Sequence, residues 1–341
     1  MSKLIKKIIT AAGAVFILSS LAGFGCTKVL VGGMPFGVKF RSEGIVVVGF
    51  SEVETESGNV SPAYDAGLRV NDMIISVNGR EVKTSAEFID IIEASQSAVE
   101  VTYSRGGNTE TVSFTPSVSA ADGKLKTGMW IRDTTAGIGT VTYIDPCSGS
   151  FAGLGHGICD PESGELLEME KGVVVGVRIS GVVRGREGFP GELKGFFTGE
   201  KSGVLVGNTL CGVYGVMNDI PRDKVQLPET DTAGRDEVMA GDAEVWCTLD
   251  DNMPQKYKIR IDSVDRTSVS DNRSFTITVT DKRLIDKTGG IVQGMSGSPI
   301  IQGGKLVGAV THVLVSDPTR GYGIFIENML DSVKIAYPIS A

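Results

Sequence analysis

The stretch that decides the interpretation of most of this chain is residues 294–299, Gly-Met-Ser-Gly-Ser-Pro. Glycine allows the strained backbone dihedral angles of a tight turn, so a turn here would present the hydroxyl of Ser296. The backbone amides of Gly294 and Ser296 could then converge on an oxyanion that develops during acyl transfer. The pattern therefore predicts a nucleophile together with its oxyanion hole.

A base for this serine is easy to search for, because a hydroxyl needs an adjacent base, usually histidine, and the chain has only two histidines. His156 lies in its own glycine-rich run, residues 153–157 (Gly-Leu-Gly-His-Gly). His312 lies in the apolar run 310–314, where a core histidine bonded to the backbone is expected. We interpret Ser296 and His156 as the nucleophile and base of a serine protease. His312 is the only replacement for the base.

Two simpler interpretations of the same stretch stay open. Residues 294–299 could by themselves be a glycine-rich turn without chemistry. Ser298 could be the nucleophile instead, but it is not followed by a glycine. The pairing with the Gly-His-Gly run favours catalysis and favours Ser296.

The composition favours β structure in about two domains. The chain has 341 residues, of which 45 are glycines, 41% are hydrophobic and 6% are aromatic, a mixture typical of turn-rich β structure. The net charge of −8, without a long basic run, argues against a nucleic-acid partner. Short apolar runs between turn signals predict a sandwich or barrel in the second part of the chain, at 139–144, 173–177, 202–206, 275–279 and 305–310.

The N-terminal segment predicts export. Lys3, Lys6 and Lys7 precede an uncharged stretch, residues 8–27, and about 20 residues of helix span the roughly 30 Å core of a bilayer. A positive flank followed by an apolar run is typical of a signal peptide or an uncleaved signal anchor. We therefore expect residues 1–27 to be one of these and the rest of the chain to leave the cytoplasm.

The five cysteines are sparse and include no Cys-x-x-Cys pair, so the spacing of a metal site is absent. We expect no metal and no other cofactor. Cys147 and Cys159 flank His156 and could form a disulfide, although buried free thiols are the simpler expectation. Cys26 could carry a lipid, but the residues before it fit a lipobox poorly.

Residues 34–117 have the element order of a PDZ domain. The run 61–79 holds a short Pro-Ala-x-x-Ala-Gly-Leu helix and ends in a Val-Asn-Gly hairpin signal. The other expected elements are strands at 36–40, 44–50, 99–104 and 109–115 and a helix at 85–94. This order resembles the PDZ domains of bacterial proteases.

A PDZ domain binds an extended peptide as an added strand, with the backbone amides of one loop holding the C-terminal carboxylate. The loop that matches in this sequence is Pro35, Phe36, Gly37 and Val38, which we predict to bind a peptide ligand. The alternative is that Phe36 merely packs in the core and the groove is vestigial.

The second domain, residues 118–341, resembles the serine peptidases of the stage IV sporulation protein B family. The residues that carry the resemblance are 135–140, 153–160, 288–300 and 308–312. With an N-terminal anchor and a PDZ domain, the resemblance covers essentially the whole chain. It implies a mainly β chain in which the PDZ domain (α+β, a partly open β-barrel) precedes a chymotrypsin-like β-barrel protease domain.

The resemblance also implies roles for three residues, with Ser296 as nucleophile, His156 as base and Asp281 as the third member. The order of histidine, acid and serine is that of chymotrypsin. Asp281 precedes Ser296 by only 15 positions, whereas the acid of a chymotrypsin-like barrel lies far upstream. Asp160 and Asp219 are therefore alternative acids, and Asp281 could be an ordinary structural aspartate.

The function that the resemblance implies is signalling proteolysis during endospore formation. Such an enzyme acts between the inner and outer forespore membranes, cleaves a regulator of an intramembrane protease, and so activates processing of a late mother-cell sigma factor. It also cleaves itself near its N-terminus. Two other functions stay open: a PDZ-containing binding scaffold with an inactive protease domain, and a general quality-control protease.

Overall fold

The structure is a computed structural model that describes residues 28–336, except 160–163, 165, 168, 170, 220–226, 251–252 and 268–271. The predicted signal peptide or anchor, residues 1–27, lies outside the described residues, and so does the alternative acid Asp160. Within the described part of the chain, no helix is long and apolar enough to cross a membrane.

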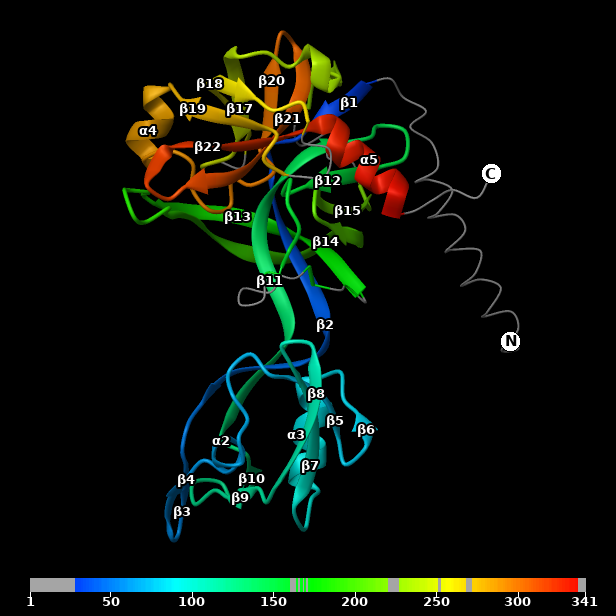
Figure 1. Ribbon diagram of the computed structural model, residues 1–341, viewed down its shortest axis with the longest axis vertical. Coiled ribbons are helices and arrows are strands. Elements are labelled where there is room, and N and C mark those ends of the chain that lie inside the picture. The colour runs from blue at the N-terminus through cyan, green and yellow to red at the C-terminus, as the bar shows by residue number, and fades with distance from the viewer. Residues whose placement is uncertain are drawn as a thin grey trace, which may run out of the picture. The chain divides into compact units, whose positions relative to one another are not determined.

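The chain forms two compact units, each described here by itself. One unit is Phe40–Ala136 with Cys159–Lys171, and the other comprises the chain up to Lys39, Gly137–Ile158 and Gly172 onward. The strands β2 (Pro35–Phe50) and β11 (Met129–Ile144) contribute to both units (Figure 1). The division into domains at 34–117 and 118–341 stays a prediction.

The smaller unit pairs the second half of β2 with antiparallel strands in the order β2-β5-β7-β8. The helix α3 (Ser85–Glu93) begins where Thr84 and Glu87 form a capping box, close to the helix expected at 85–94. Its buried side chains Phe88 and Ile92 pack into the core of this unit. The remaining elements are β3 (Val53–Thr55), β4 (Gly58–Val60), α2 (Pro62–Asp65), β5 (Met73–Val77), β6 (Arg80–Glu81), β7 (Val99–Arg105), β8 (Asn108–Phe114), β9 (Ser117–Val118) and β10 (Leu125–Lys126).

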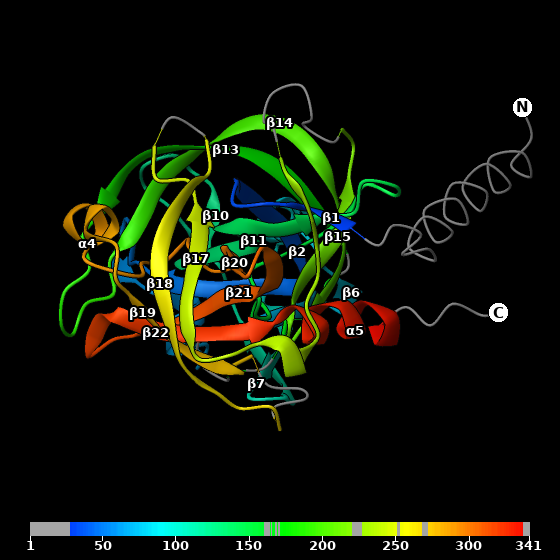
Figure 2. The ribbon, with the colours of Figure 1, turned by 90° about the horizontal axis from the view of Figure 1, so that it is seen from above.

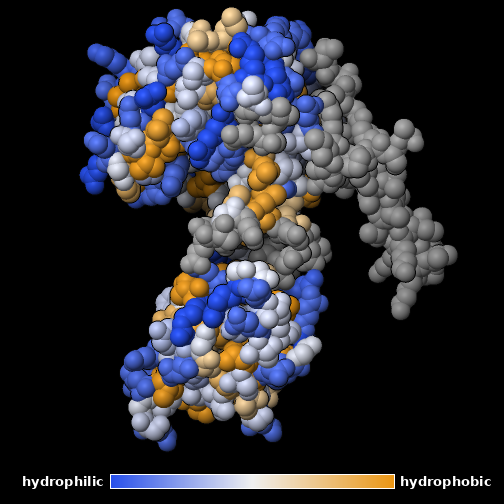
Figure 3. Space-filling model, in the orientation of Figure 1, coloured by the Kyte–Doolittle hydropathy of each residue, from blue (hydrophilic) through white to orange (hydrophobic). Residues whose placement is uncertain are grey.

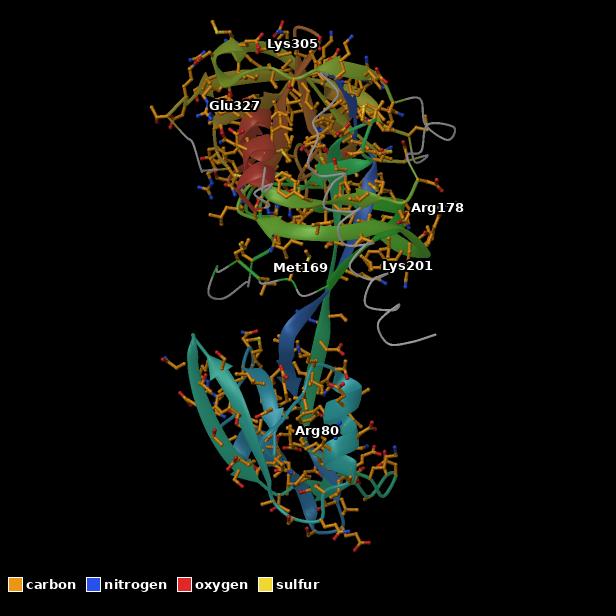
Figure 4. All side chains as sticks on the ribbon, turned by 90° about the vertical axis from the view of Figure 1, so that its right-hand side faces the viewer. Arg80, Met169, Arg178, Lys201, Lys305 and Glu327 are labelled. Carbon is orange, nitrogen blue, oxygen red and sulfur yellow. The ribbon has the colours of Figure 1, made fainter. Side chains whose placement is uncertain are left out.

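The larger unit contains two groups of antiparallel strands. In the first group the order is β11-β12-β15-β14-β13-β2, and β2 also pairs with β11, so the pairings form a closed cycle. Figure 4 labels Arg178 on β13 and Lys201 on β14, two exposed residues of its longest hairpin. The strands added here are β12 (Ser150–Gly153), β13 (Lys171–Val183), β14 (Glu192–Thr209) and β15 (Gly212–Met217), with β1 (Lys28–Val31) and β16 (Glu229–Asp231) at one edge.

The second group is a closed six-stranded barrel, which Figure 2 shows from above. Its pairing order is β17 (Gly241–Cys247), β18 (Gln255–Val264), β19 (Phe275–Val279), β22 (Asp317–Phe325), β21 (Lys305–Leu314) and β20 (Pro299–Gln302). Its interior is filled by fully buried side chains such as Ile259, Ile277 and Phe325. The helices α4 (Lys282–Thr288) and α5 (Ile326–Ala336) follow β19 and β22.

The expectation of a mainly β chain with a barrel in its second part is confirmed by this architecture. Large exposed hydrophobic side chains are dispersed along the chain, and Figure 3 shows hydrophobic and hydrophilic residues interspersed on the visible face. The two barrel-like groups matter for function because the nucleophile and base predicted from the sequence lie on different ones.

Candidate active site

The predicted nucleophile turn lies between α4 and β20 and is held by a strand of the other barrel-like group. Gly294 and Gly297 have φ angles of 95° and 91°, a region that favours glycine. A Cβ atom on Gly297 would lie 2.1 Å from the carbonyl oxygen of Thr140. Thr140 on β11 donates its amide to the Ser296 carbonyl (2.9 Å) and its hydroxyl to the Gly294 carbonyl (2.9 Å). The turn is therefore fixed on both sides of Ser296.

The Ser296 hydroxyl is half-buried and donates a hydrogen bond to the carbonyl oxygen of Thr311 on β21 (2.9 Å). In this arrangement its proton faces the backbone and not a base. Rotation about χ1 between staggered wells moves the hydroxyl without moving the turn.

Ser298 is fully buried, and its hydroxyl has no hydrogen-bond partner among the residues that the structure describes. A buried hydroxyl without access to solvent cannot meet a peptide substrate. The geometry therefore favours Ser296 over Ser298 as the nucleophile.

The oxyanion hole predicted from the sequence consists of the backbone amides of Gly294 and Ser296. Within the described chain neither of them donates to a backbone carbonyl, whereas the amides of Met295 and Gly297 donate to Val292 and Val310. Two such amides beside a nucleophilic hydroxyl can stabilise the charge of a tetrahedral intermediate.

His156 lies just after β12, where Leu154 and Gly155 have positive φ angles of 67° and 68°. Its Nδ1 atom lies 2.8 Å from the carbonyl oxygen of Gly157. Because a carbonyl only accepts, Nδ1 carries the proton and Nε2 is left as the basic nitrogen. Burial lowers the pKa of His156 below its usual value, against a smaller opposing effect of the bond to Gly157. The imidazole is therefore neutral at neutral pH, as a general base must be.

The two histidines lie side by side in the larger unit. The ring centroids of His156 and His312 are 5.1 Å apart, with the ring planes inclined by 37°. His312 directly follows Thr311, whose carbonyl oxygen accepts the hydrogen bond from the Ser296 hydroxyl. Two adjacent residues of β21 therefore contact the two candidates: Thr311 accepts from Ser296, and His312 lies beside His156. The pairing of Ser296 with His156 as nucleophile and base stays a prediction.

Asp281 does not join them. Its carboxylate caps α4, accepting from the Arg283 backbone amide (3.0 Å), pairs with the Arg283 guanidinium (2.8 Å) and accepts from the Lys258 amide (3.1 Å). Arg283 is the main reason that the pKa of Asp281 falls to about 2. Among the described contacts none links Asp281 to His156. The structure therefore does not support the expected orienting role, because the residue is used as a helix cap. The alternative acid Asp219 is exposed beyond the end of β15.

Pro35, Phe36, Gly37 and Val38 form the start of β2 in the larger unit. Phe36 is buried there, with its ring 5.6 Å from that of Phe151 in an edge-to-face arrangement. This corrects the assignment of these residues to a peptide-binding loop of the smaller unit. The alternative in which Phe36 packs in a core fits its position.

The smaller unit has a hollow elsewhere, between α3 and the chain that leads into β11. It encloses about 680 Å³ and is lined by Phe88 and Ile92 of α3 and by the segment 124–129, together with Ile131. The lining also includes charged side chains such as Glu93 and Lys124, and a groove of mixed character beside a helix suits an extended peptide. Sequence patterns missed it because the second wall comes about 30 residues after α3, beyond the expected domain end.

The cysteines do not form the pair considered from the sequence. Cys147 is in a disulfide, whereas Cys159, Cys211 and Cys247 are not, so a Cys147–Cys159 bond is not formed. Over the described ranges, no group of three or more His, Cys, Asp or Glu side chains could hold a metal ion.

Family models match both parts of the chain. The model of the family described as SpoIVB peptidase S55 matches residues 123–330, and that of the PDZ domain matches residues 57–105. No curated protein matches the chain.

Solved structures show weaker likeness. The PDZ domain of an SdrC-like protein from Listeria monocytogenes is 22% identical, with a TM-score of 0.22, over 26% of this chain and 87% of that one. The inactive form of the Rv3671c protease from M. tuberculosis is 14% identical, with a TM-score of 0.34, over 59% and 84%. The HtrA-type protease AlgW with a decapeptide is 12% identical, with a TM-score of 0.34, over 60% and 53%.

Proposed function

This chain belongs to the SpoIVB peptidase S55 family and is a serine peptidase with a PDZ domain, and we propose that Ser296 is its nucleophile and His156 its base. The observation that carries the proposal is that two adjacent residues of β21, Thr311 and His312, contact Ser296 and His156 respectively. The hydroxyl of Ser296 donates a hydrogen bond to the carbonyl oxygen of Thr311. The next residue, His312, packs against the ring of His156.

The chemistry follows from the geometry. The Ser296 hydroxyl turns from the Thr311 carbonyl toward His156 Nε2, which takes the proton as the oxygen attacks the peptide carbonyl. The amides of Gly294 and Ser296 stabilise the oxyanion, and His156 returns the proton to the leaving amine. A water molecule then attacks the acyl-enzyme, with His156 again taking and returning a proton, and the acid product leaves Ser296. Through both halves the Gly157 carbonyl accepts from Nδ1 of His156.

Labelling with a fluorophosphonate probe tests this assignment directly. The probe should modify Ser296 in the full-length protein, and the adduct should be found on the tryptic peptide that contains residue 296. Ser298→Ala should label like the unchanged protein, and Ser296→Ala should not label at all. A label on Ser298, or none in a correctly folded protein, would contradict the proposal.

The physiological part of the proposal rests on the family and on the N-terminal sequence. We place the enzyme outside the cytoplasm, attached to a membrane through residues 1–27 or released from it, in the space between the two forespore membranes. Its substrate would be a membrane-bound regulator of an intramembrane protease, so that cleavage activates a late mother-cell sigma factor. Support comes from the family that the chain belongs to and from the basic and apolar order of residues 1–27.

Self-cleavage near the N-terminus is part of the same proposal. N-terminal sequencing of the mature protein from sporulating cells, compared between the unchanged chain and Ser296→Ala, tests it. A shortened N-terminus that depends on Ser296 supports self-processing. The same N-terminus in both proteins would point to signal peptidase or to an uncleaved anchor.

The PDZ unit supports binding of a peptide or protein substrate. We place the bound segment in the hollow beside α3, against Phe88 and Ile92. Ile89→Ala would then weaken binding of a peptide ligand, because Ile89 lines the same hollow and is exposed, whereas Phe36→Ala would destabilise the larger unit without a direct effect on that binding.

Two observations favour a second function, a PDZ-containing scaffold with an inactive protease domain. The Ser296 hydroxyl is engaged by a carbonyl, and the structure does not bring Asp281 to the base. The probe experiment decides between the two, because an inactive site leaves Ser296 unlabelled in the folded protein.

A further inference from the structure

The loop that carries His156 is clamped by a side chain from another strand. Asn208 lies near the end of β14, and its side-chain oxygen accepts from the Ile158 amide (2.9 Å). Its side-chain nitrogen donates to the Ile158 carbonyl (2.8 Å). The two bonds bind both polar groups of one backbone residue, as a neighbouring strand would.

The clamp itself is anchored in regular structure. Asn208 pairs with Val213 of β15, and the neighbouring Thr209 pairs with Gly212. Side chains on sheet strands are held more precisely than those on loops. Asn208 therefore holds the backbone of Ile158 at a fixed position relative to the sheet.

Ile158 is joined directly to Gly157, whose carbonyl accepts from Nδ1 of His156. The run around the base is rich in glycine, with Gly155 in a positive-φ conformation, so its backbone is intrinsically free to adopt other conformations. A fixed carbonyl at Gly157 requires an external constraint, and Asn208 provides one.

We propose that Asn208 is a positioning residue for the peptidase reaction: it fixes the Gly157 carbonyl, which selects the Nδ1-protonated form of His156 and its orientation toward Ser296. This inference rests on the proposed roles of Ser296 and His156. It gives the chain a substitute for the carboxylate that holds the imidazole in the Ser-His-Asp triads. It also accounts for a base whose described contacts include no carboxylate.

The chemistry of the amide suits this task. The Ile158 backbone offers a donor and an acceptor, and an asparagine side chain also has one of each facing them. An aspartate of the same shape would accept from the amide but would set a negative oxygen against the Ile158 carbonyl. The clamp therefore requires the amide and not just a polar side chain of this size.

Kinetics of the full-length protein test the inference. Asn208→Ala and Asn208→Asp should both lower kcat by about 10²-fold, the loss expected from a misplaced reacting group, while KM changes little. Titration to completion with the fluorophosphonate probe counts intact sites, so that a loss of folded protein is not mistaken for a loss of turnover. The matched control is Asn218→Ala, which removes a similar bond to the backbone of Lys201 at the other end of the β14–β15 pairing and should leave turnover per site unchanged.

A spectroscopic test separates positioning from general stability. In the Ser296→Ala background, ¹⁵N chemical shifts of the two histidines report which ring nitrogen is protonated, and a His312→Gln variant assigns the signals. His156 should be Nδ1-protonated when Asn208 is present and a mixture of the two neutral forms in Asn208→Ala. This readout does not need activity, and a purely structural role would leave the tautomer unchanged.

The possible failures are distinguishable. If Ser296→Ala is active, the proposed function itself is wrong. If Ser296→Ala is inactive but both Asn208 variants keep normal turnover per titrated site, or keep the single tautomer, only the positioning role is overturned. Normal turnover in Asn208→Asp with loss in Asn208→Ala would likewise overturn the requirement for the amide.

Discussion

The hydroxyl of Ser296 donates to the backbone carbonyl of Thr311 over 2.9 Å. The proposed nucleophile is thus held on β21 of the closed barrel, while the proposed base His156 is carried by the loop after β12 of the other strand group. Neither strand group alone therefore carries both the proposed nucleophile and the proposed base. The Thr140 bonds to residues 294 and 296 join the two groups at this point, so catalysis depends on their packing against each other.

Replacement of each of the two serines by alanine gives the sharpest contrast in activity. Ser296→Ala should abolish peptide hydrolysis, with a loss of several orders of magnitude, and should keep the fold because the turn is held by its backbone. Ser298→Ala should keep most of the activity. It should also be no less stable than the unchanged protein, because it removes a buried hydroxyl that has no described partner, a group that costs about 1–3 kcal/mol.

Hydrolysis of a fluorogenic peptide and thermal melting measure both variants. Loss of activity in Ser298→Ala with survival in Ser296→Ala would contradict the assignment.

The pH dependence of kcat/KM follows from the burial of His156. The base works in its neutral form, and burial lowers the pKa of His156, so activity should fall only as the pH drops below the usual histidine value of about 6.5. In His156→Ala both the activity and its fall at low pH should be lost. Rates between about pH 4.5 and 8 measure this. A midpoint above 6.5 would mean that a carboxylate raises the pKa of the base, contrary to the contacts described.

The serine turn, the Gly-His-Gly loop and the helix at 85–94 could be predicted because short patterns fix them locally. Asp281 could not be placed, since an aspartate before a helix has the same appearance whether it caps the helix or faces a base. Pro35–Val38 were misplaced because β2 is a single strand of 16 residues that runs in both units. Asn208 leaves no local pattern at all, as its partner Ile158 is 50 positions away.

Asp281→Asn should affect stability and not turnover. The carboxylate caps α4 and pairs with Arg283, and loss of an N-cap costs about 0.5–2 kcal/mol, less here because asparagine can also cap. Turnover per titrated site should stay normal. A fall by roughly 10³–10⁴ in that turnover, as in a triad with the wrong tautomer, would instead restore Asp281 to the mechanism.

The same carboxylate predicts a change of stability with pH. Its pKa is lowered to about 2 in the folded protein, against about 3.9 in an unfolded chain. The folded state therefore binds this proton less readily, and the stabilisation is present above about pH 4 and is lost as the pH falls toward 2. Denaturant unfolding at pH 3 and 6 should show a smaller pH effect in Asp281→Asn than in the unchanged chain. An equal effect in both would show that other carboxylates dominate.

The last prediction concerns the glycine after the nucleophile. In Gly297→Ala the new Cβ would lie 2.1 Å from the Thr140 carbonyl oxygen and 2.4 Å from the Leu154 amide nitrogen, at a φ of 91°. Both neighbours are backbone atoms, so the turn must move away from β11, and the bonds that fix Ser296 must break. We expect loss of probe labelling together with a large fall in melting temperature.

Gly304→Ala is the matched control for this variant. Gly304 also has a positive φ, 81°, but a Cβ there meets nothing within 4 Å. It should show only the backbone penalty of about 1–2 kcal/mol for a left-handed residue, with normal labelling of Ser296. Equal effects of the two substitutions would mean that dihedral strain alone matters. In that case the contact between the turn and Thr140 would not be what holds the nucleophile in place.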